Sequence, residues 1–110
     1  MLEFQLESLF KHHVYYAAGS RLLAYTAICG CGPNAATLHY GHAGAPNDRL
    51  IGPRDAVLLD LGAECSGSGC YGADTTCSFP AADTFSDDQR FLFDTVRWPF
   101  ATPVPGASNL

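Results

Sequence analysis

One carboxylate inside an apolar run constrains the fold of this chain more than any other feature. Residues 56–61 read AVLLDL, and Asp60 is the only charged side chain among them. A run of this length is typical of a buried strand, where an uncompensated carboxylate costs several kcal/mol of desolvation. Asp74 occupies a similar position in the next strand candidate, residues 71–79. An antiparallel pairing of these two segments would bring both carboxylates to one point.

Two interpretations of this pair follow from the sequence. Two carboxylates that converge away from water repel each other, and a pair of divalent metal ions relieves that repulsion. Alternatively, each aspartate ends its strand and is solvated or hydrogen-bonded to a turn, because carboxylates at strand edges need no function. The pattern of residues alone leaves both interpretations open.

The first half of the chain predicts further β-structure. Residues 25–29 and 37–40 are β-prone, and they flank the turn-like residues 30–34, which together predict a β-hairpin. Residues 41–54 are expected to form a loop. With the later strand pair, this pattern indicates an antiparallel sheet.

A helix is predicted at the start of the chain, with Glu3, Glu7 and Lys11 away from its apolar side. A second helix is predicted from Ser86 through about Trp98, because Ser86 and Gln89 have the spacing of a capping box. Prolines from Pro99 onward are expected to end it. The apolar residues that recur at helical spacing near the start of the chain are Leu2, Leu6, Leu9 and Phe10.

The second helix is expected to cover the sheet. Its apolar residues should pack onto the strands, and its charged residues should face water. The fold class is therefore α/β, or α+β, with an antiparallel sheet and flanking helices. The residues expected to pack are Phe91, Leu92 and Val96, and those expected in water are Asp87, Asp88 and Arg90.

Composition and charge exclude some kinds of partner. Hydrophobic residues make up 47% of the chain and charged residues 15%, so the chain is expected to pack rather than to be disordered. The net charge is −5 and the six Lys and Arg residues are scattered, which argues against nucleic acid. No apolar run reaches the ~20 residues of a membrane span, and Glu3 and Glu7 interrupt any secretory signal. A soluble, cytoplasmic chain without membrane partners is therefore predicted.

The five cysteines offer an alternative function. An odd number of cysteines without a secretory signal indicates free thiols. A thiolate zinc site would use Cys29 and Cys31 together with Cys65, Cys70 and Cys77. These residues lack the paired ligand spacings that structural zinc sites usually have.

Three blocks of sequence resemble the catalytic domain of proline dipeptidases, or prolidases. The blocks are LHYGHAGAPNDR at residues 38–49, LLDLGAE at residues 58–64 and ADTTCSFPA at residues 73–81. The resemblance covers roughly residues 3–96 and stops near Trp98. It implies a partial pita-bread fold of the creatinase/aminopeptidase-like type, with residues 1–97 as the N-terminal portion of a catalytic domain and residues 98–110 as an irregular, poorly ordered tail.

The same resemblance implies a dinuclear metallopeptidase that cleaves Xaa-Pro dipeptides. In that family two aspartates, one histidine and two glutamates bind a pair of divalent metal ions, commonly manganese. Asp60 would be a terminal ligand of one metal ion, and Asp74 would bridge both. His39 would lie on the substrate side, near the dipeptide or the charge that develops at the scissile bond. Intact relatives are commonly homodimers.

The chain departs from the family pattern in two ways. The spacing from Asp60 to Asp74 is about three residues longer than expected, with the extra length in residues 65–70, and such an insertion could shift the strand register. The third ligand histidine and both glutamates of the family lie downstream of any residue in this chain. We therefore expect a fragment that is inactive and poorly soluble alone. The alternative is a non-catalytic pita-bread module that binds other proteins.

The remaining polar candidates have simpler interpretations. His42 could contact substrate or could hydrogen-bond within its own loop. His12 and His13 are expected to be solvated near the end of the first helix. Arg49 is a candidate salt-bridge partner, and Asn47 and Asp48 beside it indicate loop architecture.

Overall fold

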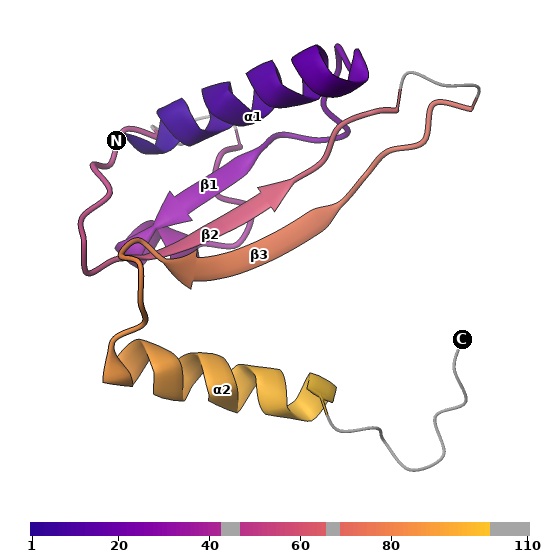
Figure 1. Ribbon diagram of the computed structural model, residues 1–110. Coiled ribbons are helices and arrows are strands. Elements are labelled where there is room, and N and C mark those ends of the chain that lie inside the picture. The colour runs from indigo at the N-terminus through magenta and orange to yellow at the C-terminus, as the bar shows by residue number, and fades with distance from the viewer. Residues whose placement is uncertain (43–46, 66–68, 102–110) are drawn as a thin grey trace, which may run out of the picture.

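The computed structural model describes residues 1–42, 47–65 and 69–101, with the backbone alone for the last four of these (Figure 1). The structure is mixed α/β, as the sequence predicts: a three-stranded antiparallel sheet follows one helix and precedes another. The elements are α1 (Glu3–Ala18), β1 (Ile28–Cys31), the 3-10 helix η1 (Gly32–Ala36), β2 (Ala56–Leu61), β3 (Thr75–Pro80) and α2 (Asp87–Ala101).

The central strand of the sheet is β2, which has the bounds that its apolar run predicts. Its two neighbours, β1 and β3, both pair with it antiparallel. In this register Asp60 lies opposite Thr76 on one side and opposite Ile28 on the other. The predicted pairing of the two later strands is confirmed, although β3 begins at Thr75, directly after Asp74.

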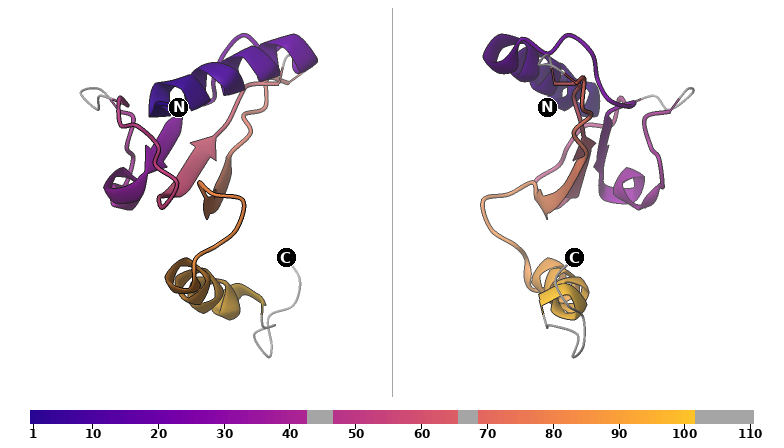
Figure 2. Two further views of the ribbon diagram at one scale, coloured as in Figure 1. Left: turned by 60° about the vertical axis from the view of Figure 1, so that its left-hand side comes forward. Right: turned by 90° about the vertical axis from the view of Figure 1, so that its right-hand side faces the viewer.

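Helix α1 covers one face of the sheet, and the other face carries η1 (Figures 1 and 2). On the α1 side, Phe10 and Val14 line a shallow pocket together with Leu59 and Leu61 of β2. Gly19 ends α1 in the left-handed conformation, with φ of 67°. The core is small and centres on β1 and β2, where the buried apolar residues are Ala27, Ile28, Cys29, Cys31, Tyr40 and Val57.

The predicted hairpin of residues 25–40 is wrong. Only β1 forms, and η1 follows it directly, because Pro33 begins a helical turn more easily than it continues a strand. Gly30 allows η1 to fold back onto the strand, since a Cβ there would lie 2.9 Å from the carbonyl oxygen of Asn34. Residues 37–40 form turns rather than a strand, and β1 pairs with β2 instead.

The start of α2 follows the sequence prediction, and its end does not. The Gln89 N–H donates to Ser86 Oγ at 3.2 Å, and the Ser86 N–H donates to Gln89 Oε1 at 3.0 Å, which completes the capping box. The helix continues past Pro99 to Ala101. A proline removes only one backbone donor, so the last turn can still form around it. Residues 98–101 are therefore helical rather than an irregular tail, and residues 102–110 lie outside the described part.

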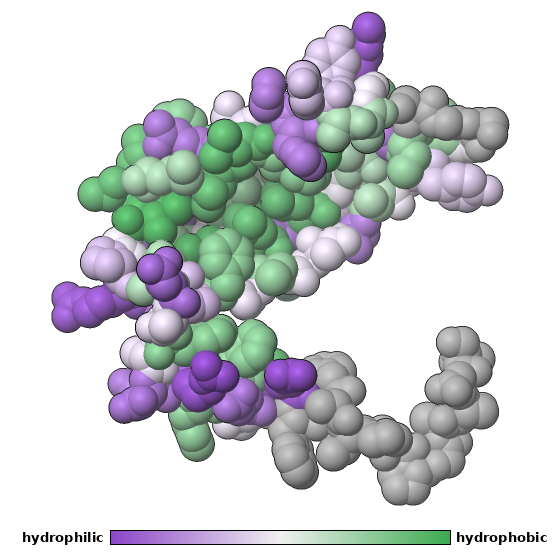
Figure 3. Space-filling view, viewed as in Figure 1, coloured by the Kyte–Doolittle hydropathy of each residue, from purple (hydrophilic) through white to green (hydrophobic). Residues whose placement is uncertain are grey.

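The prediction that α2 packs onto the sheet is also wrong. Phe91, Leu92 and Val96 are 70%, 62% and 64% exposed, although Asp87, Asp88 and Arg90 face water as expected. The chain leaves the end of β3 and carries α2 away from the sheet, and Gln89 Nε2 holds the helix start by donating to the Arg54 carbonyl at 3.1 Å. A groove of roughly 500 Å³ remains between them, with apolar residues on both sides (Figure 3).

Candidate metal and substrate site

The structure brings Asp60 and Asp74 together around one hydroxyl group. The Tyr25 Oη atom lies 2.6 Å from Asp60 Oδ1 and 3.0 Å from Asp74 Oδ1. A phenol has one hydrogen to donate, so the two carboxylates share a single donor. The predicted convergence of these two aspartates is confirmed.

The β2–β3 register explains this convergence. Thr76 lies opposite Asp60, and Asp74 precedes Thr76 by two residues. Side chains two apart on a strand point to the same face, so all three lie on one side of the sheet. Beyond the ladder the same register continues, with Glu64 paired to Gly72. The strand pairing therefore keeps one register from Ala56 to Glu64, and the centre of the extra residues, 66–68, lies outside the described part.

Tyr25 reaches the two carboxylates because its segment runs beside the end of β2. The Ala24 N–H donates to the Gly62 carbonyl at 3.0 Å. Gly62 must lack a side chain, since a Cβ there would overlap the Ala73 carbonyl oxygen and lie 2.7 Å from the Tyr25 ring. Burial, together with the two carboxylates, raises the pKa of Tyr25 well above its usual value. The phenol therefore keeps its proton.

Sequence reasoning did not find Tyr25 as a site residue. It stands only at the start of a β-prone stretch, 35 and 49 residues from its two partners. Only the tertiary fold places it between them.

A pocket of roughly 310 Å³ joins Asp60 to His39. One wall comes from the sheet and the other from η1 and the turn after it. His39 is exposed at this wall, so the histidine predicted on the substrate side and the first aspartate line the same pocket. The lining residues are Ile28, Ala35, Ala36, Thr37, Leu38, His39, Leu58, Asp60 and Thr76.

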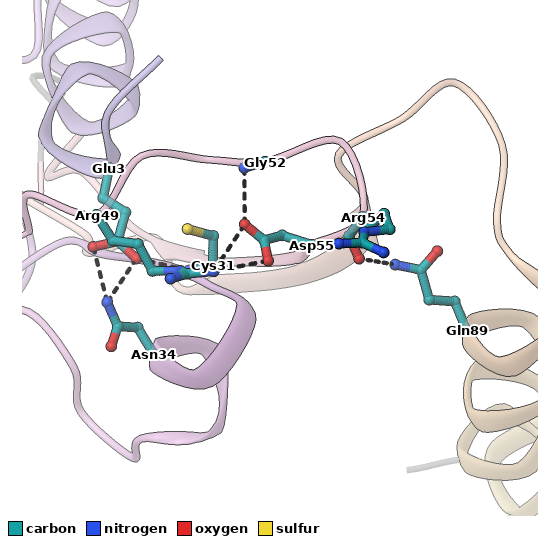
Figure 4. A network of polar contacts seen from close by, with 8 residues as sticks. All are labelled: Glu3, Cys31, Asn34, Arg49, Gly52, Arg54, Asp55 and Gln89. Atoms are coloured by element: carbon teal, nitrogen blue, oxygen red, sulfur yellow. Dashed lines mark hydrogen bonds and ion pairs between the residues drawn. The ribbon is translucent and has the colours of Figure 1, made fainter.

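The turn that carries His39 is anchored by a buried carboxylate. Glu3 is 0% exposed, which corrects the prediction of a solvent-facing residue on the first helix. Its carboxylate accepts hydrogen bonds from the Cys31 N–H at 2.8 Å, from Asn34 Nδ2 at 3.0 Å and from the Tyr40 hydroxyl at 2.7 Å. Figure 4 shows the Asn34 and Cys31 part of this network.

These donors stabilise the charged form of Glu3. Burial alone raises the pKa of the carboxyl, but the hydrogen bonds from Tyr40, Asn34 and Cys31 outweigh it and hold the pKa below its usual value. Burial, with the adjacent Glu3 charge, raises the pKa of Tyr40 to about 12. The charged carboxylate thus links α1, β1, η1 and the His39 turn.

Arg49 forms the predicted salt bridge, and its partner is Asp55. Arg49 Nη2 lies 3.0 Å from Asp55 Oδ1, and the Gly52 N–H donates to Asp55 Oδ2 at 2.8 Å (Figure 4). The Gly52 hydrogen bond, together with Arg49, holds the pKa of Asp55 below its usual value. This cluster orders the approach to β2 and lies outside the pocket lining.

The cysteines do not form a metal site in the described residues. Burial raises the pKa of Cys29 to about 12 and that of Cys31 to about 11. Cys65, Cys70 and Cys77 are exposed. Across residues 1–42, 47–65 and 69–101, no three His, Cys, Asp or Glu side chains come together as metal ligands.

Asp60 and Asp74 fit part of the ligand set of a hard divalent cation. Carboxylate oxygens are ligands suited to Mg²⁺, Ca²⁺ and Mn²⁺. Neither aspartate forms an ion pair with a basic side chain in the described part of the chain. Two adjacent negative charges that share one neutral donor leave lone pairs free, and a cation between them would relieve their repulsion.

These features agree with what comparison with known proteins shows. Residues 1–98 match metallopeptidase family M24, and the chain belongs to that family. Solved structures of pita-bread enzymes superpose on it with a TM-score of 0.78. One is proline aminopeptidase P II from Yersinia pestis, 35% identical over 91% of this chain, and another is a single-residue variant of aminopeptidase P from Escherichia coli, 32% identical. Each comparison covers 21% of the other chain.

Among curated proteins, the chain is similar to Xaa-Pro dipeptidases. It is 48% identical to the one from Rattus norvegicus over 96% of this chain, and 51% identical to the one from Homo sapiens over 87%. The chain spans about a fifth of the length of these relatives, 22% and 19% respectively. It corresponds to the N-terminal part of the family domain.

Proposed function

We propose that this chain supplies the N-terminal part of a dinuclear metal-dependent peptidase domain that hydrolyses Xaa-Pro dipeptides. The observation that carries the proposal is the convergence of Asp60 and Asp74 on the Tyr25 hydroxyl, beside a pocket that His39 lines. The rat and human relatives are named Xaa-Pro dipeptidases, which supports Xaa-Pro dipeptides as the proposed substrate class.

Each residue has a distinct role in this proposal. As the family resemblance implies, Asp60 would be a terminal ligand of one metal ion and Asp74 would hold both. The same resemblance implies manganese, and the hard oxygen donors of both aspartates suit that ion. When bound, the metal pair would polarise the scissile carbonyl and activate water. Tyr25 keeps its proton and holds both carboxylates in one orientation.

The pocket suits a proline side chain. Ile28 and Leu58 give it apolar walls, which can accept the pyrrolidine ring, and His39 adds a polar group at the exposed side. We propose that His39 faces the peptide group or the charge that develops on it. Such an arrangement would orient the substrate with its Xaa-Pro bond towards Asp60.

The 110 residues contain two of the five ligands that the family resemblance implies. Each supporting group that a metal centre lacks typically lowers its metal affinity or activity by about 10–100-fold. The loss of the other three ligands should therefore abolish catalysis. We therefore expect no cleavage of Gly-Pro by the isolated chain, even with excess manganese. We also propose a cytoplasmic location and, as the family resemblance implies, a homodimer for the intact domain.

The experiment that tests this proposal compares the isolated chain with a fusion of the chain to the downstream portion of the rat relative. The fusion is expected to cleave Gly-Pro with manganese, and the Asp74→Asn fusion is expected to lose at least about a hundredfold in rate. Asp87→Asn, at an exposed position of α2, is the control and should have no effect. Cleavage by the unmodified chain alone, absent in its Asp74→Asn variant, would show that the chain is catalytically complete.

A non-catalytic binding module remains the second candidate. Its supporting observation is the groove between α2 and β3, where Leu92 and Val96 stay exposed opposite Phe79. A fusion that binds manganese and shows no peptidase activity would favour this candidate.

None of the helices in the described residues is long and apolar enough to cross a membrane.

A further inference from the structure

The His39 ring does not stand alone at the edge of the pocket. The rings of His39 and His42 meet edge to face, with centroids 5.2 Å apart and planes at 78°. Both residues are exposed, and His42 lies outside the pocket lining, whereas His39 belongs to it. Among the described residues, the ring of His42 meets the pocket lining at His39.

The backbone of the turn imposes this contact. Tyr40, between the two histidines, is buried and hydrogen-bonded to Glu3. Gly41 has φ of 99°, and a Cβ there would lie 2.5 Å from the Ala27 carbonyl oxygen, so the turn fits tightly against the strand side. His39 itself has φ of 54°, and the His42 N–H donates to its carbonyl at 3.3 Å.

An exposed imidazole ordinarily samples several rotamers. The anchored turn fixes the backbone of His39, but it leaves the two side-chain torsions free. An aromatic contact in the edge-to-face geometry removes part of that freedom, because it favours one orientation of the ring. In the described residues, the ring contact of His39 is the one with His42.

We infer that His42 is a positioning residue for His39: its edge-to-face contact holds the His39 ring at the wall of the pocket that Asp60 shares. The value of this role to a substrate rests on the proposed function, since a partly ordered His39 ring presents its nitrogen to a bound peptide at a smaller ordering cost. The ring contact itself is a property of the turn and can be measured without metal or activity.

The experiment measures how fast diethyl pyrocarbonate modifies each histidine of the chain, read by mass spectrometry. In His42→Ala the His39 ring is free, and its modification rate is expected to rise about two- to tenfold, the range that one aromatic contact supplies. In His42→Phe the ring contact remains, and the rate is expected to stay near that of the unmodified chain. An unchanged rate in His42→Phe would show that the aromatic ring of residue 42 restrains His39, and that the imidazole nitrogens of His42 are not needed.

Two controls keep the measurement specific. His12→Ala removes a different ring contact, the stack of His12 on Tyr16 at 5.8 Å in α1, and should leave the His39 rate unchanged. Tyr40 should stay unmodified in His42→Ala, which shows that the turn keeps its fold. If Tyr40 becomes reactive, His42→Asn replaces the alanine variant, because it keeps a polar side chain at that position.

An unchanged His39 rate in His42→Ala, or in the asparagine variant where Tyr40 is reactive, would overturn the inference. Equal increases in the alanine and phenylalanine variants would overturn it as well. Failure of the proposed function has a different signature: the histidine rates would follow the expectation while Asp74→Asn left manganese binding and Gly-Pro cleavage unchanged.

Discussion

Glu3 and the pair formed by Asp60 and Asp74 differ in how many hydrogen bonds the protein donates to their carboxylates. Glu3 is fully buried and accepts hydrogen bonds from a backbone N–H, an amide and a phenol. Asp60 and Asp74 share one phenol, Tyr25. A carboxylate whose lone pairs are filled by the protein is part of the architecture, whereas a pair with free lone pairs can accept a cation.

This difference predicts opposite responses to mutation, and Glu3 gives the largest effect. Glu3→Ala leaves the Tyr40 hydroxyl, the Asn34 amide and the Cys31 N–H without their shared acceptor. We expect the free energy of unfolding to fall by about 3 kcal/mol, since each buried unsatisfied group costs roughly 1–3 kcal/mol. Pulse proteolysis in urea measures the change at low protein concentration.

The control for that prediction lies on the same helix. Glu7 is half-buried and pairs with the exposed Lys11 one turn away, so Glu7→Ala should cost clearly less than Glu3→Ala, about 1 kcal/mol or less. Equal losses in the two variants would mean that the Glu3 network adds nothing beyond helix propensity.

The hydrogen bonds to the Glu3 carboxylate also predict how the stability of the chain depends on pH. The pKa of Glu3 is lowered in the folded chain, so its stabilising contribution is present above the ordinary pKa, 4.5, and is lost as the pH falls towards the lowered value. We expect the urea midpoint to decrease through this acidic range. Glu3→Gln should be less stable near neutral pH and should show a flatter acid profile, and parallel profiles would contradict the assignment.

The smallest expected effect on stability belongs to Asp74. Its carboxylate is exposed and close to that of Asp60, so Asp74→Asn removes a repulsion and keeps a hydrogen-bond acceptor for Tyr25. The free energy of unfolding should change by less than about 0.5 kcal/mol, in either direction. A loss as large as that of Glu3→Ala would place Asp74 among the structural carboxylates.

The sequence predicts those parts of the structure that depend on local pattern. The apolar run AVLLDL gives the bounds of β2, Ser86 and Gln89 form the capping box of α2, and the strand pairing brings Asp60 to Asp74. In each case the residues that decide the outcome lie close together in the chain, or follow from the alternation of side chains along paired strands.

The predictions that fail depend on distant contacts. The helical pattern near the start of the chain predicts that Glu3 faces solvent. The pattern cannot show the three donors that bury its carboxylate, because they come from the distant residues 31, 34 and 40. Tyr25 belongs to no recognisable sequence motif. The packing of α2 depends on the direction in which the chain leaves β3. The β-prone residues 37–40 form a turn because Tyr40 is drawn into the core by Glu3, which outweighs local propensity.

The central proposal is that Asp60 and Asp74 form part of a cation site, whereas the carboxylate of Glu3 does not. Electron paramagnetic resonance of free Mn²⁺ measures binding by the isolated chain directly. We expect weak binding that Asp74→Asn reduces at least about tenfold and that Asp87→Asn leaves unchanged. Equal affinity in the unmodified chain and in both variants would contradict the claim.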